Sequence, residues 1–143
     1  MNPYMQEALI EAKKAAALGE VPVGAVLVKE QRILLRAHNL TEKQNDPLAH
    51  AELLVLQRAL TTIGTRRLTG CSLYVTLEPC PMCAGAILLA RPDRVYFGAY
   101  DPVAGACGGK TDLLSRSPVE VYGGIMEGAC STLLTDFFQS LRK

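Results

Sequence analysis

Apolar and polar residues alternate along this 143-residue chain in patterns that predict helices and strands. Residues 4–16 place apolar side chains at the spacing of one helical face, and Gly19 follows where such a helix would end. Short apolar runs separated by polar turns predict strands. These runs cover residues 23–28, 32–38, 71–77, 94–100 and about 118–122.

Three more segments have the apolar spacing of helices that pack against a sheet. They lie within residues 48–60, within residues 83–90 and from about Met126 onward. The last one carries an apolar stripe made of Cys130, Leu133, Leu134, Phe137, Phe138 and Leu141. Strands that alternate with helices after an opening hairpin predict an α/β fold, a three-layer αβα sandwich whose mixed sheet of about five strands has helices on both faces. We expect one domain over residues 1–143, since a chain of this length can bury a sizeable core.

The composition is that of an ordinary globular protein, with 49% hydrophobic and 20% charged residues. The longest apolar run, residues 84–90, is too short to cross a bilayer, so we expect no membrane partner. Charged residues near the N-terminus argue against a signal peptide and favour a cytoplasmic location. A net charge of only +1 gives no broad surface for nucleic acid, so an RNA partner would depend on local clusters of basic residues.

Two cysteines, Cys80 and Cys83, stand three apart with Pro81 between them. Such a pair can be a redox dithiol, half of a structural zinc site, part of a catalytic zinc site, or two buried small residues. Five cysteines without an export signal argue against a disulfide framework. Pro81 is typical of the first position of a helix, where the backbone dipoles favour thiolates and therefore metal binding.

The chain has two histidines, and only one of them is suited to join the cysteines. His38 follows the pattern of a partly exposed residue at a strand end. His50 precedes Glu52 by two positions at the predicted start of a helix, where both side chains can converge on a point beyond the helix end. His50, Cys80 and Cys83 would occupy three corners of a tetrahedral zinc site and leave the fourth for water, as in catalytic sites. Glu52 could then move the proton of that water.

A structural zinc site would instead need a fourth protein ligand. The remaining candidates are Cys71, Cys107, Cys130 and His38. Free cysteines are usually buried as small apolar residues, so each of these is better explained by packing or by a loop position than by metal binding.

At these residues the chain resembles the zinc-dependent cytidine deaminase superfamily, whose H-x-E and P-C-x-x-C signature appears as residues 50–52 and 79–83. Within it, the chain is similar to the bacterial tRNA-specific adenosine deaminases. The similar segments are EVPVGAVLV, HNL, NDPLAHAE, LYVTLEPCPMCAGAI, RVYFGAYDPVAGACGG and LLTDFF.

The resemblance implies a cytidine deaminase-like fold and hydrolytic deamination of adenosine to inosine in tRNA, typically at the wobble position of an arginine tRNA anticodon. Zinc-activated water would be the nucleophile, with Glu52 as the proton shuttle. Zn²⁺ would be the cofactor, the tRNA anticodon loop the partner, and a homodimer the usual assembly. The resemblance also places Asn39, Val23 and Ala51 in the base pocket and Asp101 near the nucleotide that flanks the target.

This chain departs from the family pattern at the end of the fourth predicted strand, in the loop that follows it and at the C-terminus. Tyr100 stands where the family often has arginine, and it could stack on a base instead. Gly108 and Gly109 stand where the family commonly has glycine and serine, and the chain ends at SLRK rather than in a longer basic tail. These departures weaken the case for phosphate binding and leave the chemistry intact.

Three alternatives keep parts of this interpretation. A deaminase of a free base, guanine or cytosine, would use the same zinc mechanism. A zinc-stabilised binding module would enclose the metal with a fourth protein ligand and would not need Glu52. A redox protein would retain activity after chelation.

Overall fold

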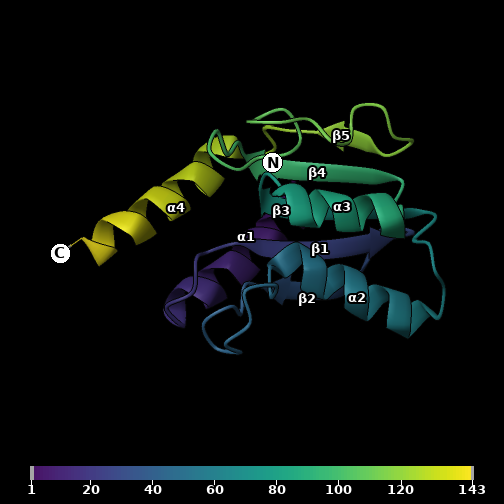
Figure 1. The fold of residues 1–143 in the computed structure, drawn as a ribbon. Helices are drawn as coiled ribbons and strands as arrows, with labels where there is room; N and C mark the ends of the chain where they lie inside the picture. The colour runs from purple at the N-terminus through teal and green to yellow at the C-terminus, as the bar shows by residue number, and fades with distance from the viewer. Residues whose placement is uncertain (1, 143) are drawn as a thin grey trace.

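A five-stranded mixed sheet runs through the protein, of which the computed structural model describes residues 2–142 (Figure 1). The strand order is β2-β1-β3-β4-β5. The strands are β1 Gly24–Lys29, β2 Arg32–His38, β3 Cys71–Leu77, β4 Arg94–Ala99 and β5 Glu120–Tyr122. β1 pairs antiparallel with β2 and β3, whereas β3 with β4 and β4 with β5 pair in parallel. The prediction of a mixed sheet is confirmed.

Helices cover both faces of the sheet, which confirms the predicted αβα sandwich (Figure 1). The helices are α1 Pro3–Ala17, α2 Ala51–Ile63, α3 Pro81–Ala90 and α4 Glu127–Leu141. α2 and α3 pack on one face, and α1 with the start of α4 packs on the other. In β1, Leu27 points to the first face while Val26 and Val28 point to the second. A continuous apolar run is what a strand needs when both of its faces are covered.

The ends of three strands differ from the sequence prediction. β1 runs one residue later than expected, over Gly24–Lys29 in place of 23–28. β4 ends at Ala99, so Tyr100 lies outside the sheet. β5 begins at Glu120, because its parallel register with β4 starts at the pair Arg94 and Glu120. The differences in β4 and β5 lie at the two ends of the long loop that connects these strands.

α4 has the predicted apolar stripe, but only its first half, Cys130, Leu133 and Leu134, packs against the core. Cys130 in the first turn is 1% exposed and packs on the sheet, whereas Phe138 is 43% and Leu141 is 65% exposed. Figure 1 shows the helix, in yellow, running away from the sheet toward the C-terminus. Periodicity identified the helix but not what lies against it. None of the helices in residues 2–142 combines the length and the apolar character needed to cross a membrane.

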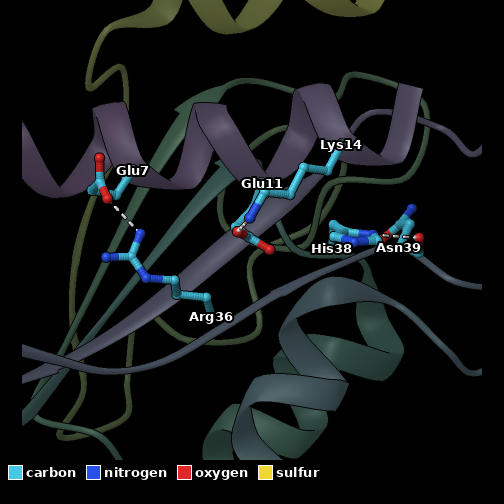
Figure 2. Close-up of polar contacts among 6 residues, drawn as sticks. All are labelled: Glu7, Glu11, Lys14, Arg36, His38 and Asn39. Atoms are coloured by element: carbon cyan, nitrogen blue, oxygen red, sulfur yellow. Dashed lines mark hydrogen bonds and ion pairs between the residues drawn. The ribbon is translucent and has the colours of Figure 1, made fainter. Parts of the chain in front are cut away.

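α1 is held close to the start of β1. A Cβ at Gly24 would lie 2.5 Å from the backbone nitrogen of Ala12, so only glycine permits this approach. Glu7 on α1 also forms an ion pair with Arg36 on β2, while Lys14 pairs with Glu11 within the helix at 2.7 Å (Figure 2). These contacts fix the segment that leads into β1, which borders the candidate site.

Candidate active site

Two helix N-termini meet at the carboxyl end of β3. His50 is the N-cap residue of α2, and Cys80 is the N-cap residue of α3, with Pro81 at its first position. The Nδ1 atom of His50 lies 3.7 Å from the sulfur of Cys80 and 3.5 Å from the sulfur of Cys83. The three donor atoms all lie within 4.8 Å of one another. The structure therefore brings together the three residues that the sequence predicted as metal ligands.

This donor set has the dimensions of a zinc site. Zinc bonds of about 2.0–2.1 Å to nitrogen and about 2.3 Å to sulfur give a nitrogen–sulfur edge of roughly 3.5 Å in a tetrahedron. The observed separations from His50 are close to that value. In residues 2–142, none of Cys71, Cys107, Cys130 and His38 belongs to the cluster. His38 turns its Nδ1 toward the carbonyl oxygen of Asn39 instead, at 3.2 Å (Figure 2).

The same three side chains strongly perturb one another's proton affinity. A hydrogen bond from the Cys83 thiol, followed by one from His50, lowers the pKa of Cys80 to about 3. The reciprocal interaction with Cys80, together with burial, raises the pKa of Cys83. The hydrogen bond to Cys80 also raises the pKa of His50. Protons shared between closely spaced donors are what a bound cation replaces, so this electrostatic pattern also fits a metal site.

Glu52 lies in the first turn of α2, directly beside this cluster. Glu52 is only 4% exposed, and burial raises the pKa of its carboxyl group above the ordinary value. His50 opposes that rise by favouring the charged form. A carboxyl group whose pKa is raised toward neutrality is suited to accept a proton and to return it.

A cavity of about 240 Å³ opens above His50, Glu52 and Cys80. Val23, Asn39 and Asp101, all expected near the substrate, line it. Its other lining residues are Val21, Thr41, Leu77, Glu78 and Ala104. The cavity therefore joins the metal donors, a buried carboxyl group and an amide side chain in one space.

Two residues expected at the substrate are not among the residues that line this cavity. Ala51 is fully buried and is not among the lining residues; its backbone N–H donates a hydrogen bond to the Asn39 side chain at 2.8 Å. Tyr100 is 48% exposed, and its ring packs edge-on against Phe97 with 4.9 Å between the ring centres. It borders a neighbouring, larger hollow beside β5 rather than the cavity with the metal donors.

Two buried glutamates did not emerge from the sequence analysis: Glu78 lines the cavity, and Glu20 binds Thr41, which also lines it. Glu20 is fully buried and accepts hydrogen bonds from the backbone of Glu42 and Lys43 and from the hydroxyl of Thr41. Glu78 is 2% exposed and holds the loop that follows β4. The available signal was a charged residue directly adjacent to an apolar strand segment, a position where an unpaired carboxylate would be costly.

Comparison with known proteins agrees with this geometry. Residues 1–99 match the model of the cytidine and deoxycytidylate deaminase zinc-binding region. The tRNA-specific adenosine deaminase of Bacillus subtilis is 51% identical over 98% of this chain and 89% of its own length. That of Agrobacterium fabrum is 43% identical over 97% of this chain and 94% of its own length.

Two solved structures extend the comparison. A structure from studies of A-to-I editing by tRNA:A34 deaminases at the wobble position superposes with a TM-score of 0.85 at 43% identity, over 92% of this chain and 98% of that one. A guanine deaminase of Bacillus subtilis superposes with a TM-score of 0.65 at 38% identity, over 70% of this chain and 66% of that one. Together with its tRNA-specific adenosine deaminase relatives, this chain belongs to the family defined by the cytidine and deoxycytidylate deaminase zinc-binding region.

Proposed function

We propose that this protein is a zinc-dependent hydrolase that deaminates adenosine to inosine in tRNA, at the wobble position of an arginine tRNA anticodon. The observation that carries the proposal is the open donor set of His50, Cys80 and Cys83 beside the buried carboxyl group of Glu52. The tRNA-specific adenosine deaminases at 43% and 51% identity support the choice of substrate.

In the proposed reaction, water replaces the amino group on the adenine ring and ammonia leaves. A zinc ion held by His50, Cys80 and Cys83 would supply the Lewis acidity that makes water nucleophilic near neutral pH. Glu52 would accept one proton from the attacking water and pass it to a ring nitrogen of the base. It would then carry the second proton, from the new hydroxyl group on the ring carbon, to the amino group, which leaves as ammonia. Asn39 orients the base through its amide, and Val23 gives the base an apolar wall.

The form of the substrate fits a small protein with little net charge. A base in a single-stranded loop costs less to extrude than one in a duplex, so binding need not supply much energy for that step. Because tRNA is the proposed substrate, we place the protein in the cytoplasm.

We also propose a homodimer, as the resemblance implies. Exposed apolar side chains on three separate segments support an interface, since Leu48 is 53%, Leu89 is 81% and Val103 is 77% exposed. Light scattering during size-exclusion chromatography tests this directly: a mass near twice 15.4 kDa is expected, and a monomeric mass at micromolar concentration would contradict it.

Incubation of purified, zinc-loaded protein with an arginine tRNA anticodon stem-loop tests the activity. Inosine at the wobble position, detected by nucleoside mass spectrometry, is the expected result. A parallel arm with free guanine and free cytosine tests the second candidate, which the likeness to a guanine deaminase supports. Deamination of a free base with no inosine in the RNA would assign the protein to that second function.

A further inference from the structure

Glu78 connects the metal donors to the opposite wall of the cavity. It follows β3 directly and precedes Cys80 by two residues. One carboxylate oxygen, Oε1, accepts a hydrogen bond from the backbone N–H of Asp101 at 2.9 Å. The other, Oε2, accepts from the backbone N–H groups of Cys107 at 2.9 Å and Gly109 at 2.7 Å.

These three bonds hold the segment of residues 101–109, which we call the 101–109 loop, around one buried side chain. Among residues 2–142, no cationic side chain forms an ion pair with Glu78. The hydrogen-bond partners of its carboxylate in this range are backbone N–H groups alone. The backbone next to Glu78 adds a further bond, from the N–H of Ala106 to the carbonyl oxygen of Pro79 at 2.8 Å. The three bonds to the Glu78 carboxylate are charge-assisted, and such bonds are roughly twice as strong as bonds between neutral groups.

The packing around the carboxylate leaves no room for side chains at two loop positions. A Cβ added at Gly105 or at Gly109 would overlap the Glu78 carboxylate and would lie 2.5 Å from the carbonyl oxygen of Asp101. Gly109 is the position at which this chain departs from the serine common in the family. Glycine at position 109 is therefore explained by the close approach of the loop to Glu78, and not by the flexibility of glycine.

We propose that Glu78 is a positioning residue, which fixes the 101–109 loop so that Asp101 and Ala104 form one wall of the substrate cavity. The argument rests on the proposed function, because that function gives the wall its role in holding the nucleotide beside the target. Asp101 stabilises the first turn of the same loop, since its Oδ1 accepts the N–H groups of Val103 at 3.0 Å and Ala104 at 3.1 Å. Glu78 thereby sets the position of Asp101 relative to Cys80.

Glu78→Gln makes this role measurable. An amide retains one acceptor oxygen, and that oxygen keeps two bonds if it takes the place of Oε2 and only one if it takes the place of Oε1. The amide NH₂ then faces the N–H of Asp101, so the end of the loop at Asp101 is the part released. Cys80 and its helix keep their own contacts.

The test is a double-mutant cycle with Glu78→Gln and Asp101→Ala, measured as kcat/KM on the anticodon stem-loop. We expect Glu78→Gln alone to lower kcat/KM by about 10- to 100-fold, and by less than about threefold in the Asp101→Ala background, because coupled residues give non-additive losses. Zinc content by mass spectrometry should stay stoichiometric. Glu30→Gln, an exposed glutamate in the turn between β1 and β2, is the matched control and should leave kcat/KM unchanged. Equal losses in both backgrounds, or loss of zinc, would overturn the proposal.

Proteolysis tests the same proposal without relying on activity. Lys110 is exposed immediately after the loop, so trypsin reports how firmly the loop is held. Glu78→Gln and Gly109→Ala should both speed cleavage after Lys110, whereas Gly128→Ala, where a Cβ meets open space, should not. If the wild type makes no inosine, the proposed function fails while this assay still decides on Glu78. Cleavage at the wild-type rate in both variants would overturn its positioning role.

Discussion

The side-chain oxygen of Asn39 accepts a hydrogen bond from the backbone N–H of Ala51 at 2.8 Å. Ala51 stands between His50 and Glu52, so this bond ties a wall of the cavity to the turn that carries both residues. The Nδ2 group of Asn39 has no hydrogen-bond partner among residues 2–142 and can donate to a base. One amide therefore has two separable tasks, and two substitutions can distinguish them.

Asn39→Asp should keep the first task and lose the second. The carboxylate still accepts the Ala51 N–H, but it cannot donate to an adenine edge. We expect a melting temperature close to the wild type with a large loss of kcat/KM. Asn39→Ala should lose activity as well and should also lower the free energy of unfolding by about 1–2 kcal/mol, because it leaves a buried N–H unpaired. Both should retain zinc. Wild-type kinetics on the stem-loop in Asn39→Asp would remove the amide from base binding.

Glu52→Gln should separate proton transfer from metal binding. The amide fills the same buried space but cannot accept and return a proton, so kcat should fall by about 10²- to 10⁴-fold. Zinc stoichiometry should be unchanged, since Glu52 is not one of the clustered donors. Inosine formation in single-turnover assays and metal content by mass spectrometry are the measurements. Inosine formation at the wild-type rate in Glu52→Gln would rule out Glu52 as the proton shuttle.

Cys83→Ala should abolish stoichiometric zinc binding, because two of the three donors cannot hold zinc in the same way. Cys71→Ala is the matched control, since Cys71 is equally buried but lies at the far end of β3. Prolonged dialysis against a chelator should inactivate the wild type, and added Zn²⁺ should restore it. Inosine formation that persists after complete metal removal would contradict the zinc-dependent mechanism.

Glu20 gives a prediction about stability and pH. Burial raises the pKa of its carboxyl group, but the hydrogen bonds from Glu42, Lys43 and Thr41 lower the pKa by more than burial raises it. The net result is a pKa below the ordinary value of 4.5. A lowered folded-state pKa stabilises the protein above 4.5 and loses that contribution as the pH falls through the folded value. Glu20→Gln should therefore lower the melting temperature at pH 7, and its difference from the wild type should shrink below pH 4.5.

The control for this experiment is Glu42→Gln. Its side chain is exposed on the same loop, and its backbone N–H still reaches Glu20. Melting curves across the pH range should match the wild type for this variant. If Glu20→Gln lowers the melting temperature by the same amount at pH 3 and pH 7, the fit of the side chain and not the charge of the carboxylate is responsible.

The elements of the fold followed from the sequence because their cause is local. Period-two and helical apolar patterns reflect burial, and Pro81 marked the start of α3 directly. The metal donors were predictable for a similar reason, since few residue types bind zinc and the chain has only two histidines. The exposed distal half of α4 was not predictable, because an apolar stripe does not say which surface covers it.

Tyr100 and Ala51 show where the resemblance was less informative. Each is adjacent in sequence to a residue that lines the cavity, yet the direction of its side chain depends on where a strand or helix ends. Glu78 and Glu20 were missed because nearly all of their partners are backbone N–H groups more than 20 residues away. Backbone partners leave no mark on the residue types of a sequence.

The direction of each strand has a consequence for how this site can change. Because β3 and β4 are parallel, the segments that follow them, with Cys80 and Asp101, emerge at the same edge of the sheet. The antiparallel pair adds the start of β1 near Val23 and the end of β2 near Asn39. Separate connections thus form separate walls, so altering one of them can reshape the cavity without shifting the strand register beneath the metal donors. A sheet arranged in this way can come to accept a different nucleobase through changes in its connecting segments alone.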